Sequence, residues 1–136
     1  MPVYKRNYAY QNTYRGNDVY ELETFEEKEA AYKAFFRSNI RGSVSILTNN
    51  ASFGDIANPI ENVNVYRNLD AFFVKDLEKN REIAAVVSPE EFEKTDFELQ
   101  YKDKKSKWIL LQYEDIQGNN IILRFEADEP VSLDLD

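Results

Sequence analysis

The last third of the chain alternates apolar and polar residues with a period of two, and this pattern restricts the fold more than any other feature of the sequence. Three successive segments carry it: Phe97, Leu99 and Tyr101; Trp108–Tyr113; and Ile121, Leu123 and Phe125. The hydrophilic stretch Lys102–Lys107 and the turn signal Gly118-Asn119-Asn120 separate these segments. Alternating segments joined by turns are typical of an antiparallel sheet with one face on a core. We therefore expect a C-terminal β-meander.

Two earlier segments carry the spacing of amphipathic helices. The first is Thr24–Asn39, in which Thr24 and Glu27 have the spacing of a capping box. Its apolar stripe consists of Phe25, Ala31, Tyr32, Phe35 and Phe36. The second runs from Asn68 to about Lys79, and its apolar residues at i, i+3, i+4 and i+8 are Leu69, Phe72, Phe73 and Leu77. A short third helix is predicted at Ser88-Pro89-Glu90-Glu91, which combines a cap, a proline at the first helical position and a capping glutamate.

Strands are predicted at Val19–Leu22, Ser43–Thr48, Ile60–Tyr66 and Ile83–Val87. We pair the first with Tyr8–Tyr14 as a hairpin, and the continuous apolar run of the last predicts a buried central strand. The expected fold class is α+β, a mainly antiparallel sheet packed against two helices plus one short helix. The 136 residues fit a single domain (1–136), with a basic tyrosine-rich arm or edge hairpin at 1–17. The acidic tail at 127–136 is expected either to fray or to add an edge strand at Val131–Leu135.

The sequence contains no histidine and no cysteine. Catalytic triads, cysteine–histidine pairs and zinc sites built on these residues therefore lack their essential side chains. The four glycines, at positions 16, 42, 54 and 118, form neither a Walker A motif nor a dinucleotide fingerprint. We predict a protein that is not an enzyme and that has no cofactor and no metal site. Carboxylates such as Asp55, or Asp134 with Asp136, leave a Mg²⁺-dependent hydrolase as an alternative.

The formal net charge of −8 favours a basic partner. It disfavours duplex nucleic acid and anionic membranes, because phosphate groups need a basic face. No apolar run approaches the length of a membrane span, and the N-terminus lacks the apolar core of a signal peptide. We therefore expect a cytoplasmic protein.

The charge is unevenly distributed along the chain. Residues 1–17 contain three cations and no acid, so they carry +3 while the remainder carries −11. Tyrosines lie among these cations, and the residues concerned are Tyr4, Lys5, Arg6, Tyr8, Tyr10, Tyr14 and Arg15. Tyrosine rings beside cations can stack on a base and pair with a phosphate. The same arm could instead pack on its own acidic domain, or on the next subunit of a homo-oligomer.

The polar loop from Asn49 to Pro59 is another candidate site. An exposed Phe53 would anchor a partner, whereas a buried Phe53 would only hold the loop in place. Asp55 lies in the same loop, and Arg41 could approach its base.

These observations lead to one main hypothesis and two alternatives. We expect a non-enzymatic binding protein, an acidic inhibitor, immunity or counter-defence module that docks on a larger, more basic macromolecule. One alternative is a protein that binds or sequesters a nucleotide with the basic arm. The other is a structural subunit of a phage or secretion assembly. The expected partner-binding residues are those of the arm together with Arg41, Phe53 and Asp55.

Overall fold

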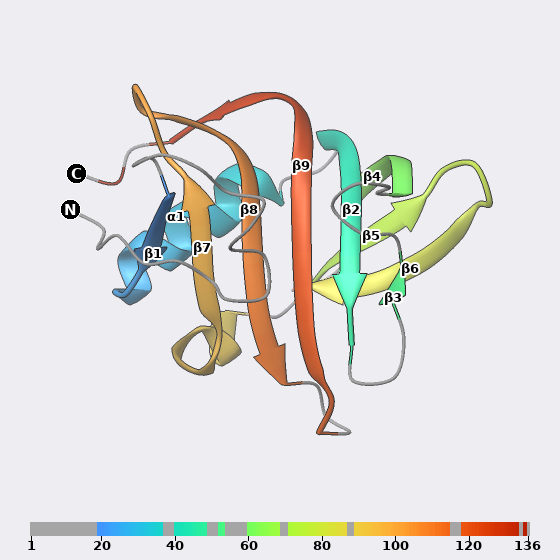
Figure 1. Cartoon of the computed structure of the whole chain (residues 1–136), viewed down its shortest axis with the longest axis horizontal. Helices are drawn as coiled ribbons and strands as arrows, with labels where there is room; N and C mark the ends of the chain where they lie inside the picture. The colour runs from blue at the N-terminus through green and yellow to red at the C-terminus, as the bar shows by residue number, and fades with distance from the viewer. Residues whose placement is uncertain are drawn as a thin grey trace.

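A computed structural model describes residues 19–36, 40–48, 52–53, 60–68, 71–86, 89–114, 118–133 and 135. Within these ranges the chain forms an antiparallel sheet with one α-helix and one 3₁₀ helix. The helix α1 (Phe25–Phe35) lies across one face of the sheet, behind β7 and β8 in Figure 1. The predicted α+β class is confirmed. None of the described helices is long and apolar enough to cross a membrane.

The sheet has the strand order β1-β7-β8-β9-β2-β4-β5-β6, with β3 pairing with β2, and all described pairs are antiparallel. The strands are β1 (Val19–Leu22), β2 (Ile40–Leu47), β3 (Ser52–Phe53), β4 (Ile60–Asn68), β5 (Ala71–Asp76), β6 (Arg81–Val86), β7 (Asp96–Gln100), β8 (Lys105–Glu114) and β9 (Asn120–Ser132). Because β7, β8 and β9 are neighbours in both sequence and space, the predicted C-terminal meander is confirmed. β9 lies between the two parts of the sheet, β1-β7-β8 and β2-β4-β5-β6.

The capping box predicted for the first helix is present. The Thr24 hydroxyl accepts from the N–H of Glu27 at 3.1 Å, and the Thr24 N–H donates to Oε1 of Glu27 at 3.3 Å. These two bonds satisfy backbone donors that the first turn would otherwise leave free. The helix then turns Ala31, Tyr32 and Phe35 toward the sheet, where all three are buried.

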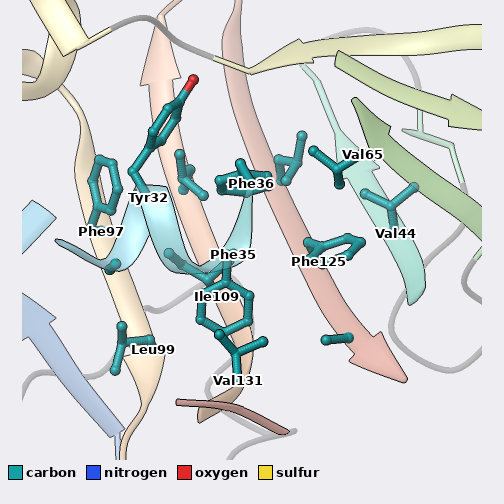
Figure 2. Packing of buried hydrophobic residues seen from close by; sticks show 14 of the residues in the cluster. Tyr32, Phe35, Phe36, Val44, Val65, Phe97, Leu99, Ile109, Phe125 and Val131 are labelled. Carbon is teal, nitrogen blue, oxygen red and sulfur yellow. The ribbon is translucent and has the colours of Figure 1, made fainter. Parts of the chain in front are cut away.

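Aromatic rings join α1 to the sheet, as Figure 2 shows for the buried cluster. Phe35 meets Phe125 of β9 edge-on, with ring centroids 6.4 Å apart, and Phe36 lies 5.8 Å from the same ring. Burial of a side chain of this size stabilises the fold by about 1.5–3 kcal/mol. Both phenylalanines are fully buried, so this contact fixes α1 over the middle of the sheet.

The prediction of a second long helix at 68–79 is wrong. The described residues of this segment end β4, form β5 and enter a turn. Val65 pairs with Val74 across β4 and β5, and both are buried in the core. Oδ1 of Asp76 accepts from the N–H groups of Glu78 at 3.1 Å and Lys79 at 3.3 Å. An aspartate that bonds the backbone in this way stabilises a turn in competition with a helix.

Two further predictions of local structure differ from the fold, and a third is not tested by it. The Ile83–Val87 run, predicted as a central strand, contributes to β6, the last strand of the order and hence an edge. The short helix after Ser88 is a 3₁₀ helix, η2 (Pro89–Lys94). β1 pairs with β7, and its predicted partner Tyr8–Tyr14 lies outside the described residues.

The C-terminal residues continue the sheet. β9 extends to Ser132, and its last residues pair with the start of β8, Ser132 with Lys105 and Val131 with Ser106. Val131, Leu133 and Leu135 are buried. The described part of the acidic tail therefore contributes apolar side chains to the core.

Gly42 lies where the backbones of β2 and β9 leave no room for a side chain. It pairs with Val63 of β4 on one side and with Ala127 of β9 on the other. A Cβ atom built at this position would overlap the carbonyl oxygen of Glu126. The absence of a side chain therefore lets β2 and β9 pair at this point.

Candidate functional site

Phe25 is the most exposed large apolar side chain of α1. It lies at the first helical position, after Thr24, and 49% of its surface is accessible. The sequence placed Phe25 on the apolar stripe of the helix, and in the structure Phe25 is half exposed whereas Ala31, Tyr32, Phe35 and Phe36 are buried. The ring of Phe25 packs against the ring of Phe92 in η2.

Two kinds of contact hold η2 against α1. Nζ of Lys28 donates to the carbonyl oxygen of Phe92 at 2.8 Å, and both residues are buried. The Phe92 ring lies 5.8 Å from the ring of Phe25 and 4.8 Å from that of Tyr32, measured between centroids. Phe92 also meets Phe97 of β7 edge-on at 5.2 Å. The exposed ring of Phe25 thus packs on Phe92, which itself packs against Tyr32 and Phe97. We call these three buried rings the aromatic platform.

The segments that form this platform carry several exposed carboxylates and two exposed cations, Lys33 near the end of α1 and Lys94 at the end of η2. We define the α1–η2 surface as Phe25 with the acidic residues Glu23, Glu26, Glu90, Glu91 and Glu93, all of which are exposed. The buried Lys28 places its ammonium group against Phe92 and 5.9 Å from the Phe97 ring centroid, inside the protein. Glu26 also interacts favourably with the helix dipole, which stabilises acids in a first turn. The surface therefore combines an apolar ring with concentrated negative charge.

The opposite face of the sheet carries a different arrangement. We call it the second face; it is turned away from α1 and toward the viewer in Figure 1. Strand register places five residues in one row across β1, β7, β8, β9 and β2, namely Glu21, Glu98, Leu110, Arg124 and Ser45. Val19, Trp108 and Leu110 form a buried apolar cluster there, with Ile122 packed against it.

Arg124 is the central cation of the second face. Its Nη1 lies 2.9 Å from Oε1 of Glu126, and its guanidinium carbon lies 5.2 Å from the Trp108 ring centroid. Such a cation above an indole ring is attracted by the ring electrons. Glu21 and Glu98 lie directly opposite each other on β1 and β7, so two carboxylates share the other end of the row.

The structure places few of the predicted binding residues. Tyr4, Lys5, Arg6, Tyr8, Tyr10, Tyr14, Arg15 and Asp55 lie outside the described residues. Phe53 belongs to β3 and pairs with Ile46 near the end of β2. Arg41 pairs with Asn64 near the start of β2. Arg41 and the β3 strand are therefore about 16 Å apart along β2, given a rise of roughly 3.3 Å per residue.

Arg41 is exposed and lines an open cavity of about 380 Å³ between β2 and the late part of β9. Asp128 and Glu129 also line this cavity, together with Ile40, Ala127, Pro130 and Val131. Carboxylates beside the arginine oppose the binding of a phosphate. The described part of the chain thus does not favour this cavity as a nucleotide site.

Sequence reasoning missed both Phe25 as an exposed ring and the row on the second face. The position of Phe25 directly after a helix cap, before the first buried turn, was an available signal. The pairing of Glu21 with Glu98 has no local signal, since it joins strands that are far apart in the chain. Among the described residues, no group of three or more acidic, histidine or cysteine side chains is arranged to hold a metal ion.

No protein-family model matches the chain, and neither a curated protein nor a solved structure is significantly similar to it.

Proposed function

We propose that the protein is a non-enzymatic binding protein that docks on a larger, more basic macromolecule through the α1–η2 surface. The observation that carries this proposal is the 49% exposure of Phe25 on a packed platform whose segments also carry five exposed glutamates. Exposed aromatic rings on rigid supports are typical anchors of protein interfaces. Covering the remaining half of this ring would contribute about 1 kcal/mol.

The carboxylates supply attraction at longer range. Negative charge concentrated on one surface steers a basic partner into contact and raises the association rate. Salt screens this effect over about 10 Å at 0.1 M. A partner whose cationic face normally receives phosphates suits the surface best, and this supports an inhibitor, immunity or counter-defence role.

The test is co-purification from cells of the native source with the tagged full-length chain and two variants. Phe25→Ala removes the anchor, and the triple variant Glu26→Gln, Glu90→Gln, Glu93→Gln removes three charges of the surface. The matched control is Glu61→Gln, Glu78→Gln, Glu129→Gln, which removes three exposed charges elsewhere.

We expect a basic protein to be recovered with the wild type and the control and to be lost with both surface variants. Its association rate should fall with salt. Equal recovery of the same partner by all four chains would refute docking through this surface.

A further inference from the structure

The hairpin between β7 and β8 concentrates positive charge in an acidic chain. Its residues Lys102–Lys107 include four lysines, all exposed, and one aspartate, so the segment carries +3 whereas the whole chain carries −8. We call this segment the lysine hairpin. No acid in the described part of the chain forms an ion pair with any of its lysines. The described fold thus leaves these four ammonium groups open to a partner.

The backbone holds the lysine hairpin in a tight turn. Lys102 and Lys105 pair across it, and each donates its N–H to the carbonyl oxygen of the other at 3.0 Å. Asp103 and Lys104 between them have φ of 55° and 60°, a conformation in which glycine and asparagine are favoured. The N–H of Leu133 donates to the carbonyl oxygen of Lys104 at 3.1 Å, which ties the turn to the end of β9. The turn therefore presents a lysine at its tip on a fixed support.

The positions of the lysines favour an anionic partner. Lys102 and Lys105 are direct neighbours across the hairpin, and like charges in such positions repel. A carboxylate that approaches both ammonium groups replaces this repulsion with attraction. Because the turn is already fixed, its backbone loses little further freedom when it docks.

The acidic α1–η2 surface lies at the other end of β7. η2 ends at Lys94, just before β7, and Leu22 of β1 pairs with Phe97, so α1 begins at this end as well. The lysine hairpin follows the opposite end of β7, as can be followed in Figure 1. β7 alone is about 16 Å long, whereas an ion pair needs its charged groups within about 4 Å. The two surfaces of one molecule are therefore too far apart to pair.

We propose that the lysine hairpin of one copy docks on the α1–η2 surface of a second copy, so that the protein associates with itself head to tail. The four lysines then meet a surface with five exposed glutamates. The half-exposed ring of Phe25 can receive the aliphatic stem of a lysine and attract its ammonium group. The contact uses the surface of the proposed function, and it covers that surface until a basic partner displaces the second copy.

A second copy suits the lysine hairpin better than a nucleic acid does. A nucleic acid carries phosphates along its whole length, and most of them would face a chain of net charge −8. Two copies of the chain also repel each other at long range, so the ionic strength decides which effect is larger. At about 0.1 M salt, charges more than about 10 Å apart are screened while adjacent pairs persist. At about 1 M the screening length falls to about 3 Å, and the adjacent pairs are weakened as well.

Sedimentation velocity of the purified full-length chain measures this association. We expect the average mass to rise with protein concentration at about 0.1 M salt and to return to that of the monomer at about 1 M. Because the contact joins two different surfaces, each added copy leaves one of each free, and species larger than a dimer should form. A monomer at every concentration in about 0.1 M salt would overturn the proposal.

Charge reversal gives a sharper test. One variant, Lys102→Glu, Lys104→Glu, Lys105→Glu, makes the hairpin acidic. The other, Glu26→Lys, Glu90→Lys, Glu93→Lys, makes the α1–η2 surface basic. Each variant alone should remain a monomer, because its two surfaces then have like charge, whereas an equal mixture should associate.

The matched control is Lys33→Glu, Arg41→Glu, Lys79→Glu, which reverses three exposed cations outside both surfaces and should still associate. Circular dichroism identical to that of the wild type shows that the variants are folded. A mixture of the two folded variants that stays monomeric would refute pairing between these surfaces, as would loss of association in the control.

Two further outcomes separate this proposal from its neighbours. If the hairpin variant loses retention on immobilised single-stranded DNA but self-associates like the wild type, the hairpin contacts nucleic acid and the proposal is overturned. Self-association is measured on the purified chain alone, whereas the proposed function requires recovery of a basic protein from cells. Either result can therefore fail without the other.

Discussion

Replacing Gly42 by alanine tests how closely β2 and β9 approach. The added Cβ would overlap the carbonyl oxygen of Glu126 and approach the Cα of Ala127 at 3.0 Å. Both neighbours are backbone atoms of a paired strand, so they cannot rotate away as a flexible side chain could. β2 also pairs with β4 at the same residue, so a shift away from β9 disturbs the pairing on the other side.

The expected cost follows from two opposing effects. Overpacking of a close-packed interior by one carbon costs about 1–3 kcal/mol. Loss of glycine freedom in the unfolded chain stabilises the variant by about 0.4–1 kcal/mol. The net expectation for Gly42→Ala is a free energy of unfolding lower by about 1–2 kcal/mol. With a urea dependence of about 2 kcal/mol per molar, the midpoint should fall by roughly 0.5–1 M.

Urea unfolding followed by far-ultraviolet circular dichroism measures this midpoint. Ser43→Ala is the matched control, because it changes the next residue of β2 without adding an atom near β9, and its effect should stay within about 0.5 kcal/mol. A Gly42→Ala midpoint equal to or above that of the wild type would refute the steric argument, because only the entropic gain would then remain.

Three further changes test the helix and its contacts by the same unfolding measurement. Thr24→Ala removes the capping box and should cost about 1 kcal/mol, while Thr24→Ser should retain most of it; equal losses would contradict the capping role. Phe125→Ala leaves a cavity under α1 and should cost about 3–5 kcal/mol, and a loss below about 1 kcal/mol would show that the ring is not central to the core. Lys28→Met leaves the carbonyl oxygen of Phe92 without its donor and should cost about 1–3 kcal/mol. Lys33→Met, at an exposed position, should change stability by less than about 0.5 kcal/mol. Equal effects at the two lysines would show that the buried hydrogen bond from Lys28 to Phe92 does not stabilise the fold.

Predictions from the sequence were correct where the structure depends on residues that are close together in the chain. Thr24 and Glu27 are three residues apart and cap the helix without help from the rest of the chain. The alternation from Phe97 to Phe125 predicted the meander because each strand pairs with the next. Both features depend on contacts that are near in sequence.

The prediction of a second helix was wrong because the apolar residues of this segment fit a strand as well as a helix. Apolar residues at Phe72, Phe73 and Leu77 fit a helical stripe, yet the strand pairing of Val65 with Val74 buries apolar area as well. The deciding feature was Asp76, whose bonds to the following backbone favour a turn. The candidate site was harder to predict, because Phe25 meets Phe92 across more than sixty residues of chain.

The position of β9 determines when the sheet can be completed during synthesis. Among the described strands, β9 is made last, yet it alone connects β1-β7-β8 with β2-β4-β5-β6. During synthesis the two groups of strands therefore expose unpaired edges until residues 120–132 have emerged. Pairings between distant segments form slowly, and open edges invite association with other chains. A nascent chain of this protein should depend on chaperones until its final strand arrives.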